Sequence, residues 1–183
     1  GSTNYRGRIP DRISIEQRSK IVDKRSRIGD WELDTIIGKG HKQAIVSLTE
    51  RKTRLAPLAK VQRKTAESVS RSIRRLLEPI ASKVVTLTSD NGKEFARHQE
   101  IATALRANFY FAHPYSSWER GLNENTNGLI RQYFPKKHDF TTITEKDIYM
   151  VINKLNNRPR KCLGFKTPNQ VFFGLKPSVA LGT

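Results

Sequence analysis

Alternating apolar and polar residues mark the first half of the chain. The run IGDWELDTIIGK at 28–39 mixes β-branched and aromatic residues with polar ones, which is typical of a strand that ends at glycine. Two more strand patterns follow at about 43–49 and 54–61, and the polar turn between them predicts an antiparallel meander. The sheet therefore begins with three successive strands.

Beyond residue 61 the apolar spacing changes to that of helices. Thr65 is a candidate N-cap, and apolar residues recur at helical spacing up to Pro79, which predicts an amphipathic helix. The remaining pattern predicts, in order, a buried strand at 83–88, a helix at 94–107, a strand at 108–112, and helices at 123–133, 145–156 and 167–173. We expect an α/β domain with a mixed sheet.

The length of 183 residues and the 36% hydrophobic content fit one domain that can bury a core. The opening Gly1-Ser2 has the form of an expression scar, and the stretch up to Arg27 is rich in Arg, Ser and Asp with little periodicity. We therefore expect residues 1–27 to be a scar followed by an arm or linker, and residues 28–183 to be the domain.

The net charge of the chain is the feature that most narrows the class of its partner. Thirty-four Lys and Arg against 17 Asp and Glu give a formal charge of +17, which favours a polyanionic partner, above all nucleic acid. No apolar run approaches the roughly 20 residues of a membrane span, so we expect a soluble, cytoplasmic protein without a membrane partner. The single Cys162 excludes an internal disulfide, and the four histidines lack the spacing of a zinc site.

Three carboxylates stand out in this basic chain: Asp34 within the first strand, Asp90 directly after a buried strand, and Glu124 at the start of a helix. Joint ionisation of three converging acids is costly without a cation, whereas two hard divalent ions about 4 Å apart need such ligands. The three acids are therefore candidate catalytic residues and ligands of two divalent ions, for which Mg²⁺ is the natural choice.

Each acid also has an ordinary structural interpretation. Asp34 fits a solvent-facing strand position, although aspartate is depleted in strands. Asp90 belongs to Asp-Asn-Gly, a common tight-turn sequence, but it also lies at a strand end where α/β sheets bind ligands. Glu124 suits the positive end of a helix dipole.

Four further residues are candidates for contact with DNA. Arg120 precedes Glu124 by four residues, and Arg131 follows it by seven, so both arginines are placed to meet phosphates; ordinary surface charge is the alternative. Trp118 either stacks on a base or packs into the core or loop. Asn123 either contacts DNA or caps the helix, and capping is favoured.

Three blocks carry a family resemblance: WELDTIIGKG, TLTSDNGKEF and WERGLNENTNGLIRQYF. They resemble the DDE catalytic core of bacterial transposases of the insertion-sequence-thirty family, which is close to that of retroviral integrases. Thirty-three residues separate Asp90 from Glu124, as in this family, and the resemblance runs from about residue 19 to residue 177.

The resemblance implies a ribonuclease H-like fold, a mixed five-stranded sheet flanked by helices, with two Mg²⁺ or Mn²⁺ ions held by Asp34, Asp90 and Glu124. It implies hydrolysis at the ends of a mobile element and transfer of the freed 3′-hydroxyl to target DNA, by a homodimer or higher oligomer associated with the bacterial nucleoid. The helix-turn-helix region of full-length members has no counterpart here. A ribonuclease H-like nuclease without strand transfer and an inactive DNA-binding module stay as alternatives.

Overall fold

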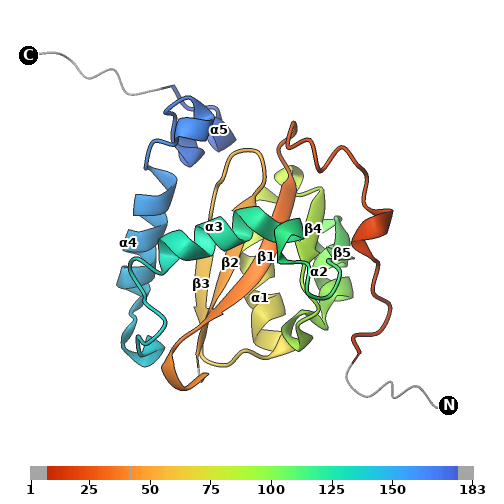
Figure 1. Ribbon diagram of the computed structural model, residues 1–183, viewed down its shortest axis with the longest axis horizontal. Helices are drawn as coiled ribbons and strands as arrows, with labels where there is room; N and C mark the ends of the chain where they lie inside the picture. The colour runs from red at the N-terminus through yellow and green to blue at the C-terminus, as the bar shows by residue number, and fades with distance from the viewer. Residues whose placement is uncertain (1–7, 42, 177–183) are drawn as a thin grey trace, which may run out of the picture.

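The computed structural model describes residues 8–41 and 43–176, and a five-stranded sheet lies at its centre (Figure 1). The strand order is β3-β2-β1-β4-β5. The bounds are Asp30–Ile37 for β1, Ala44–Glu50 for β2, Leu58–Val61 for β3, Thr86–Ser89 for β4 and Asn108–Phe111 for β5.

Strand pairing confirms the mixed sheet. β1, β2 and β3 form the antiparallel meander, while β4 lies parallel to β1 and β5 lies parallel to β4. The third strand is shorter than predicted and begins only at Leu58, because Pro57 has no N–H to give to a ladder. The carboxyl ends of β1, β4 and β5 therefore meet at one edge of the sheet.

Helices cover both faces of the sheet. Their bounds are Ala66–Leu77 for α1, His98–Leu105 for α2, Gly121–Ile130 for α3, Glu145–Asn156 for α4 and Pro168–Phe173 for α5. In Figure 1, α3 crosses in front of the sheet and α1 lies behind it. The Thr65 side chain caps α1 as predicted, and α4 has the predicted bounds, whereas α2 is shorter than expected because residues 93–95 form a separate 3₁₀ turn.

Two apolar cores result from the alternation of side chains along β1. Trp31 and Leu33 join the larger core with α1 and α2, whereas Ile36 joins the smaller core with α3 and α4. Since neighbouring side chains point to opposite faces, Glu32 and Asp34 share the face of Ile36. The strand thus directs both acids towards the α3 side.

The segment 8–27 packs on the domain. Ile9 belongs to the larger core, Val22 is fully buried, and the Phe111 N–H donates to the Ile13 carbonyl oxygen at 2.9 Å. Ser14 also forms a parallel bridge with Phe111 beside β5. The expected arm is therefore, over its described part, a fixed wall beside the last strand.

No helix within residues 8–41 and 43–176 combines the length and apolar character that crossing a bilayer requires.

Candidate active site

Asp34 lies in the middle of β1, opposite Ser47 of β2, and 22% of its side chain is exposed. Its Oδ1 accepts a hydrogen bond from the Thr35 N–H at 2.8 Å, and its Oδ2 accepts one from Asn127 Nδ2 at 2.9 Å. Two donors therefore fix both oxygens of this carboxylate, one of them from α3.

Asp90 follows β4 directly, and its Oδ1 accepts a hydrogen bond from the Gly92 N–H at 2.8 Å. This is the turn that the Asp-Asn-Gly sequence predicts. The turn leaves Oδ2 free of that bond, and 41% of the side chain is exposed. Asp90 can therefore be both a turn residue and an active-site residue, because the turn presents its carboxylate at the end of the strand.

One guanidinium joins these two acids. Arg120 Nη1 lies 3.5 Å from Asp34 Oδ2, and Arg120 Nη2 lies 3.6 Å from Asp90 Oδ2. Only 12% of the Arg120 side chain is exposed, so it lies between the carboxylates. Its charge is engaged by the two acids, and its burial differs from the ordinary surface charge that was the alternative.

The charge balance at Asp34 reflects this arrangement. Burial raises the pKa of Asp34 above its ordinary value, the Arg120 charge and the Thr35 N–H lower the pKa, and the neighbouring Asp90 raises it. An additional cation in the cluster would relieve both the burial cost and the repulsion.

Glu124 lies in the first turn of α3, as the helix-dipole interpretation requires, and its side chain is exposed. It precedes Asn127 by three residues, so the two side chains lie on neighbouring positions of one helix face. Within the described part of the chain, no group of three His, Cys, Asp or Glu side chains is gathered closely enough to hold a metal. The structure therefore brings together Asp34 and Asp90, and leaves Glu124 outside their cluster.

Arg131 ends α3, and its guanidinium donates to the carbonyl oxygens of Ile37 at 3.0 Å and Phe134 at 3.4 Å. Burial lowers the pKa of Arg131. Its donors tie the end of α3 to the end of β1, which is a structural role that the sequence did not indicate.

The environments of Asn123 and Trp118 each exclude one of the interpretations drawn from the sequence. Asn123 is fully buried, and its Oδ1 accepts hydrogen bonds from the hydroxyls of Thr49 at 3.2 Å and Ser47 at 3.4 Å. Capping by Asn123 is wrong, because α3 begins at Gly121, and its burial also leaves no surface for DNA. Trp118 is 74% exposed, so packing into the core is wrong and the ring is open to a partner.

Sequence reasoning missed the role of Asn127 and the presence of Glu94. Glu94 is buried, accepts a hydrogen bond from Thr35 Oγ1 at 2.9 Å and lies 3.9 Å from Lys64. A Cβ at Gly92 would crowd the Glu94 carboxylate, which would have to move to admit a side chain there. The only available signals were the spacing of three from Glu124 to Asn127 and the short distance in sequence between Asp90 and Glu94.

A cavity of about 550 Å³ opens beside Asp90 and Arg120. Asn91, Gly92 and the loop 112–117 complete its lining. The Asp90 carboxylate and the Arg120 guanidinium are thus reached from solvent through this cavity.

Comparison with known sequences finds transposases. The chain is 52% identical over 173 residues to the transposase for insertion sequence element IS4351 of Bacteroides fragilis, which covers 94% of this chain and 53% of that protein. It is 40% identical over 158 residues to transposase InsI for insertion sequence element IS30A of Escherichia coli (strain K12), covering 86% of this chain and 41% of that protein. The chain spans about half the length of these relatives, and no family model matches it.

Comparison with solved structures finds integrase catalytic cores. The catalytic core domain of BIV integrase superposes with a TM-score of 0.58 at 22% identity, covering 79% of this chain and 93% of that one. The HTLV-2 integrase catalytic core domain in complex with magnesium gives a TM-score of 0.62 at 19% identity, covering 80% and 97%. These likenesses establish the predicted ribonuclease H-like fold.

Proposed function

We infer that this chain, which is homologous over most of its length to transposases of the insertion-sequence-thirty family, is the catalytic core of a DNA transposase. Its substrates would be the phosphodiester bonds at the ends of a mobile element and in target DNA. Hydrolysis at the element end frees a 3′-hydroxyl, and that hydroxyl then displaces an oxygen at a target phosphate in a single transesterification.

The observation that carries this proposal is that the carboxylates of Asp34 and Asp90 both lie beside the guanidinium of Arg120. The two acids come from different strands, yet both lie within 3.6 Å of the same guanidinium. Glu124 lies in the first turn of the helix whose Asn127 reaches Asp34. Two carboxylates in place, with a third at the start of the adjoining helix, form a donor set of hard oxygens.

This donor set fits Mg²⁺ or Mn²⁺, because both ions prefer carboxylate oxygens. An added positive charge would also offset the burial and the repulsion from Asp90 that raise the pKa of Asp34. We propose that Asp34, Asp90 and Glu124 hold two such ions. When bound there, the ions would activate the attacking oxygen and stabilise the leaving one.

The chain's own residues prepare this site. The Thr35 N–H and Asn127 fix the direction of the Asp34 carboxylate, and the Gly92 N–H fixes that of Asp90. Arg120 neutralises the pair in the DNA-free chain and is placed to pass one donor to a phosphate that enters. The formal charge of +17 draws DNA towards the surface.

The partners follow from this chemistry. We propose that the chain binds element ends and target DNA, and that it works as a homodimer or larger oligomer because two DNA ends must be joined together. In this reading binding by this chain depends mainly on phosphate contacts, so its affinity falls steeply as salt rises.

The test is a cleavage and joining assay on oligonucleotides that carry an element end, with Mg²⁺ or Mn²⁺ present. Glu124→Gln is compared with Glu145→Gln, which removes the same charge from the first turn of α4. Metal-dependent joining that is lost only in Glu124→Gln supports the transposase. Cutting without joining would favour the nuclease, and binding without either reaction would favour an inactive module.

A further inference from the structure

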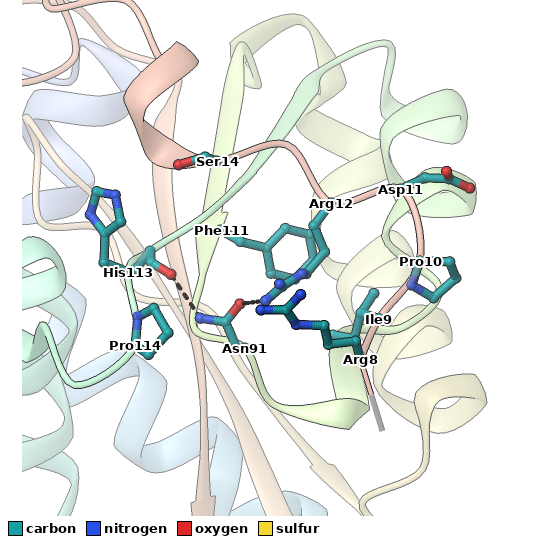
Figure 2. Close-up of a pocket in the computed structure, with 11 residues that line it drawn as sticks. Arg8, Ile9, Pro10, Asp11, Arg12, Ser14, Asn91, Phe111, His113 and Pro114 are labelled. Carbon is teal, nitrogen blue, oxygen red and sulfur yellow. Dashed lines mark hydrogen bonds between the residues drawn. The ribbon is translucent and has the colours of Figure 1, made fainter. Parts of the chain in front are cut away.

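A second hollow adjoins the candidate active site, and the N-terminal arm forms one of its walls (Figure 2). Its volume is about 600 Å³, and the arm residues 8–12 and Ser14 face Asn91 and the segment 111–114 across it. Asn91, Ala112, His113 and Pro114 line both this hollow and the one beside Asp90. The two hollows therefore adjoin at these four residues, and together they are called the groove.

The arm wall is held in place by packing and hydrogen bonds. Ile9 is 7% exposed within the larger core, and the Pro10 carbonyl oxygen lies 3.0 Å from Nε2 of the buried His98. The bridge from Ser14 to Phe111 closes the other end. The groove is thus a feature of the folded domain.

Two arginines give the groove its charge. In Figure 2 the side chains of Arg8 and Arg12 both extend in the direction of Asn91, and Arg12 donates to Asn91 Oδ1. Among the residues that the structure describes, neither arginine has a carboxylate within 4.0 Å. Two like charges that face one hollow without a carboxylate beside them repel each other, and an anion placed between them removes that cost.

The acids nearby do not supply that anion. Asp11 lines the hollow, but Figure 2 shows its carboxylate extending away from the two guanidinium groups. Glu16 and Glu119 are both bound to the His113 ring, at 3.1 and 2.7 Å. The unmatched charge of the groove is therefore positive.

The other lining residues suit a nucleotide. Ile9, Phe111 and Pro114 provide apolar surface next to the two cations, and the volume falls within the roughly 300–1,000 Å³ of small-ligand sites. A nucleotide combines a phosphate with an apolar sugar and base surface in the same way.

Resting on the proposed function, we propose that this groove holds the single DNA strand next to the reacting phosphate, and that Arg8 and Arg12 bind its phosphates. Asn91 directly follows Asp90 and lines both hollows, so a strand at Asp90 continues past Asn91 into the arm groove. On binding, Arg12 exchanges its bond to Asn91 for a charge-assisted bond to phosphate. The arm is then part of the substrate site.

The test measures binding of a fluorescent single-stranded oligonucleotide by anisotropy at several salt concentrations, with EDTA present. The double variant Arg8→Gln/Arg12→Gln is compared with Arg71→Gln/Arg75→Gln, which removes two exposed charges from α1, outside the lining of the groove. Loss of two phosphate contacts lowers the slope of log K against log salt by about 1.4. The α1 variant should keep the slope, and Arg8→Lys/Arg12→Lys should largely restore it.

Equal slopes for the two Gln pairs, whether both unchanged or both reduced, would overturn the proposal. A photoreactive base in the oligonucleotide gives an independent check, since adducts should map to residues 8–14 or 111–114, and adducts found only elsewhere would also overturn it. Because neither measurement requires metal or reaction, a failed groove and a failed transposase assay are distinguishable results.

Discussion

Asn127→Ala is the most informative single substitution near the candidate active site. It removes the 2.9 Å hydrogen bond from Nδ2 to Asp34 Oδ2, which links α3 to the middle of β1. Asn125→Ala is the matched control, because Asn125 is an exposed asparagine two positions earlier on the same helix. Both changes carry the same gain in helix propensity, up to about 0.7 kcal/mol, which cancels in the comparison.

The expected magnitude follows from the type of bond. Hydrogen bonds to charged groups contribute about 1.5–3 kcal/mol, and the 22% exposure of Asp34 reduces this through water. We therefore expect Asn127→Ala to lower the free energy of unfolding by about 1–2 kcal/mol relative to Asn125→Ala at pH 7. For a chain of this size the melting temperature would differ by about 2–8 °C.

The pH dependence gives a second prediction of the same reasoning. Asn127 lowers the pKa of Asp34, so it stabilises the ionised carboxylate. Its contribution is present while Asp34 is ionised and is lost as pH falls through the folded-state pKa of Asp34. Because burial raises that pKa overall, the difference between the two variants should begin to shrink at a higher pH than for an ordinary aspartate.

The assay is urea unfolding of both variants followed by circular dichroism, repeated from pH 7 down into the acid range. Equal free energies for Asn127→Ala and Asn125→Ala at pH 7 would refute the hydrogen bond as a stabilising link. A difference that persists unchanged in acid would refute its dependence on the Asp34 charge.

Two further substitutions test the packing, and one titration tests the loop that contains His113. Gly128→Ala on α3 has no atom within 4 Å of the added Cβ, so thermal unfolding should show a gain of about 0.5–1 kcal/mol from helix propensity. Gly38→Ala places a Cβ 2.5 Å from the Phe140 ring, so the same experiment should show a loss of about 1–3 kcal/mol, and a neutral result would contradict this contact. The hydrogen bond to Glu119 raises the pKa of His113 above 6.5, which an NMR titration should detect. The stabilisation by His113 should be complete below about pH 6.5 and should disappear as pH rises through the raised pKa. An unshifted pKa would contradict the His113–Glu119 hydrogen bond.

Local sequence determined most of the elements of the fold. Helix α4 has the predicted bounds because Thr144 and Asp147 form a capping box and its apolar residues recur on one face. The meander of β1 to β3 followed from alternation, and the turn at Asp90 followed from Asp-Asn-Gly. Each of these features depends on residues that are close in sequence, which is why the pattern was sufficient.

The charge environment of the site was decided by tertiary structure. No local pattern shows that Arg120 bridges Asp34 and Asp90, that Arg131 instead donates to the Ile37 carbonyl oxygen, or that Asn123 faces the hydroxyls of β2. These partners are distant in sequence, and the fold alone brings them within bonding distance. The residue types indicated the chemistry of the site, whereas the direction of each side chain in the fold decided which residues contact each other.

The arm beside β5 shows the same division. Its composition gives the positive charge of Arg8 and Arg12, which sequence alone determined. Only the packing of Ile9 and the bridge to Phe111 place that charge next to Asn91 and the candidate catalytic Asp90. Contacts made across the folded chain, which have no periodic signature, therefore decided where the charge can act.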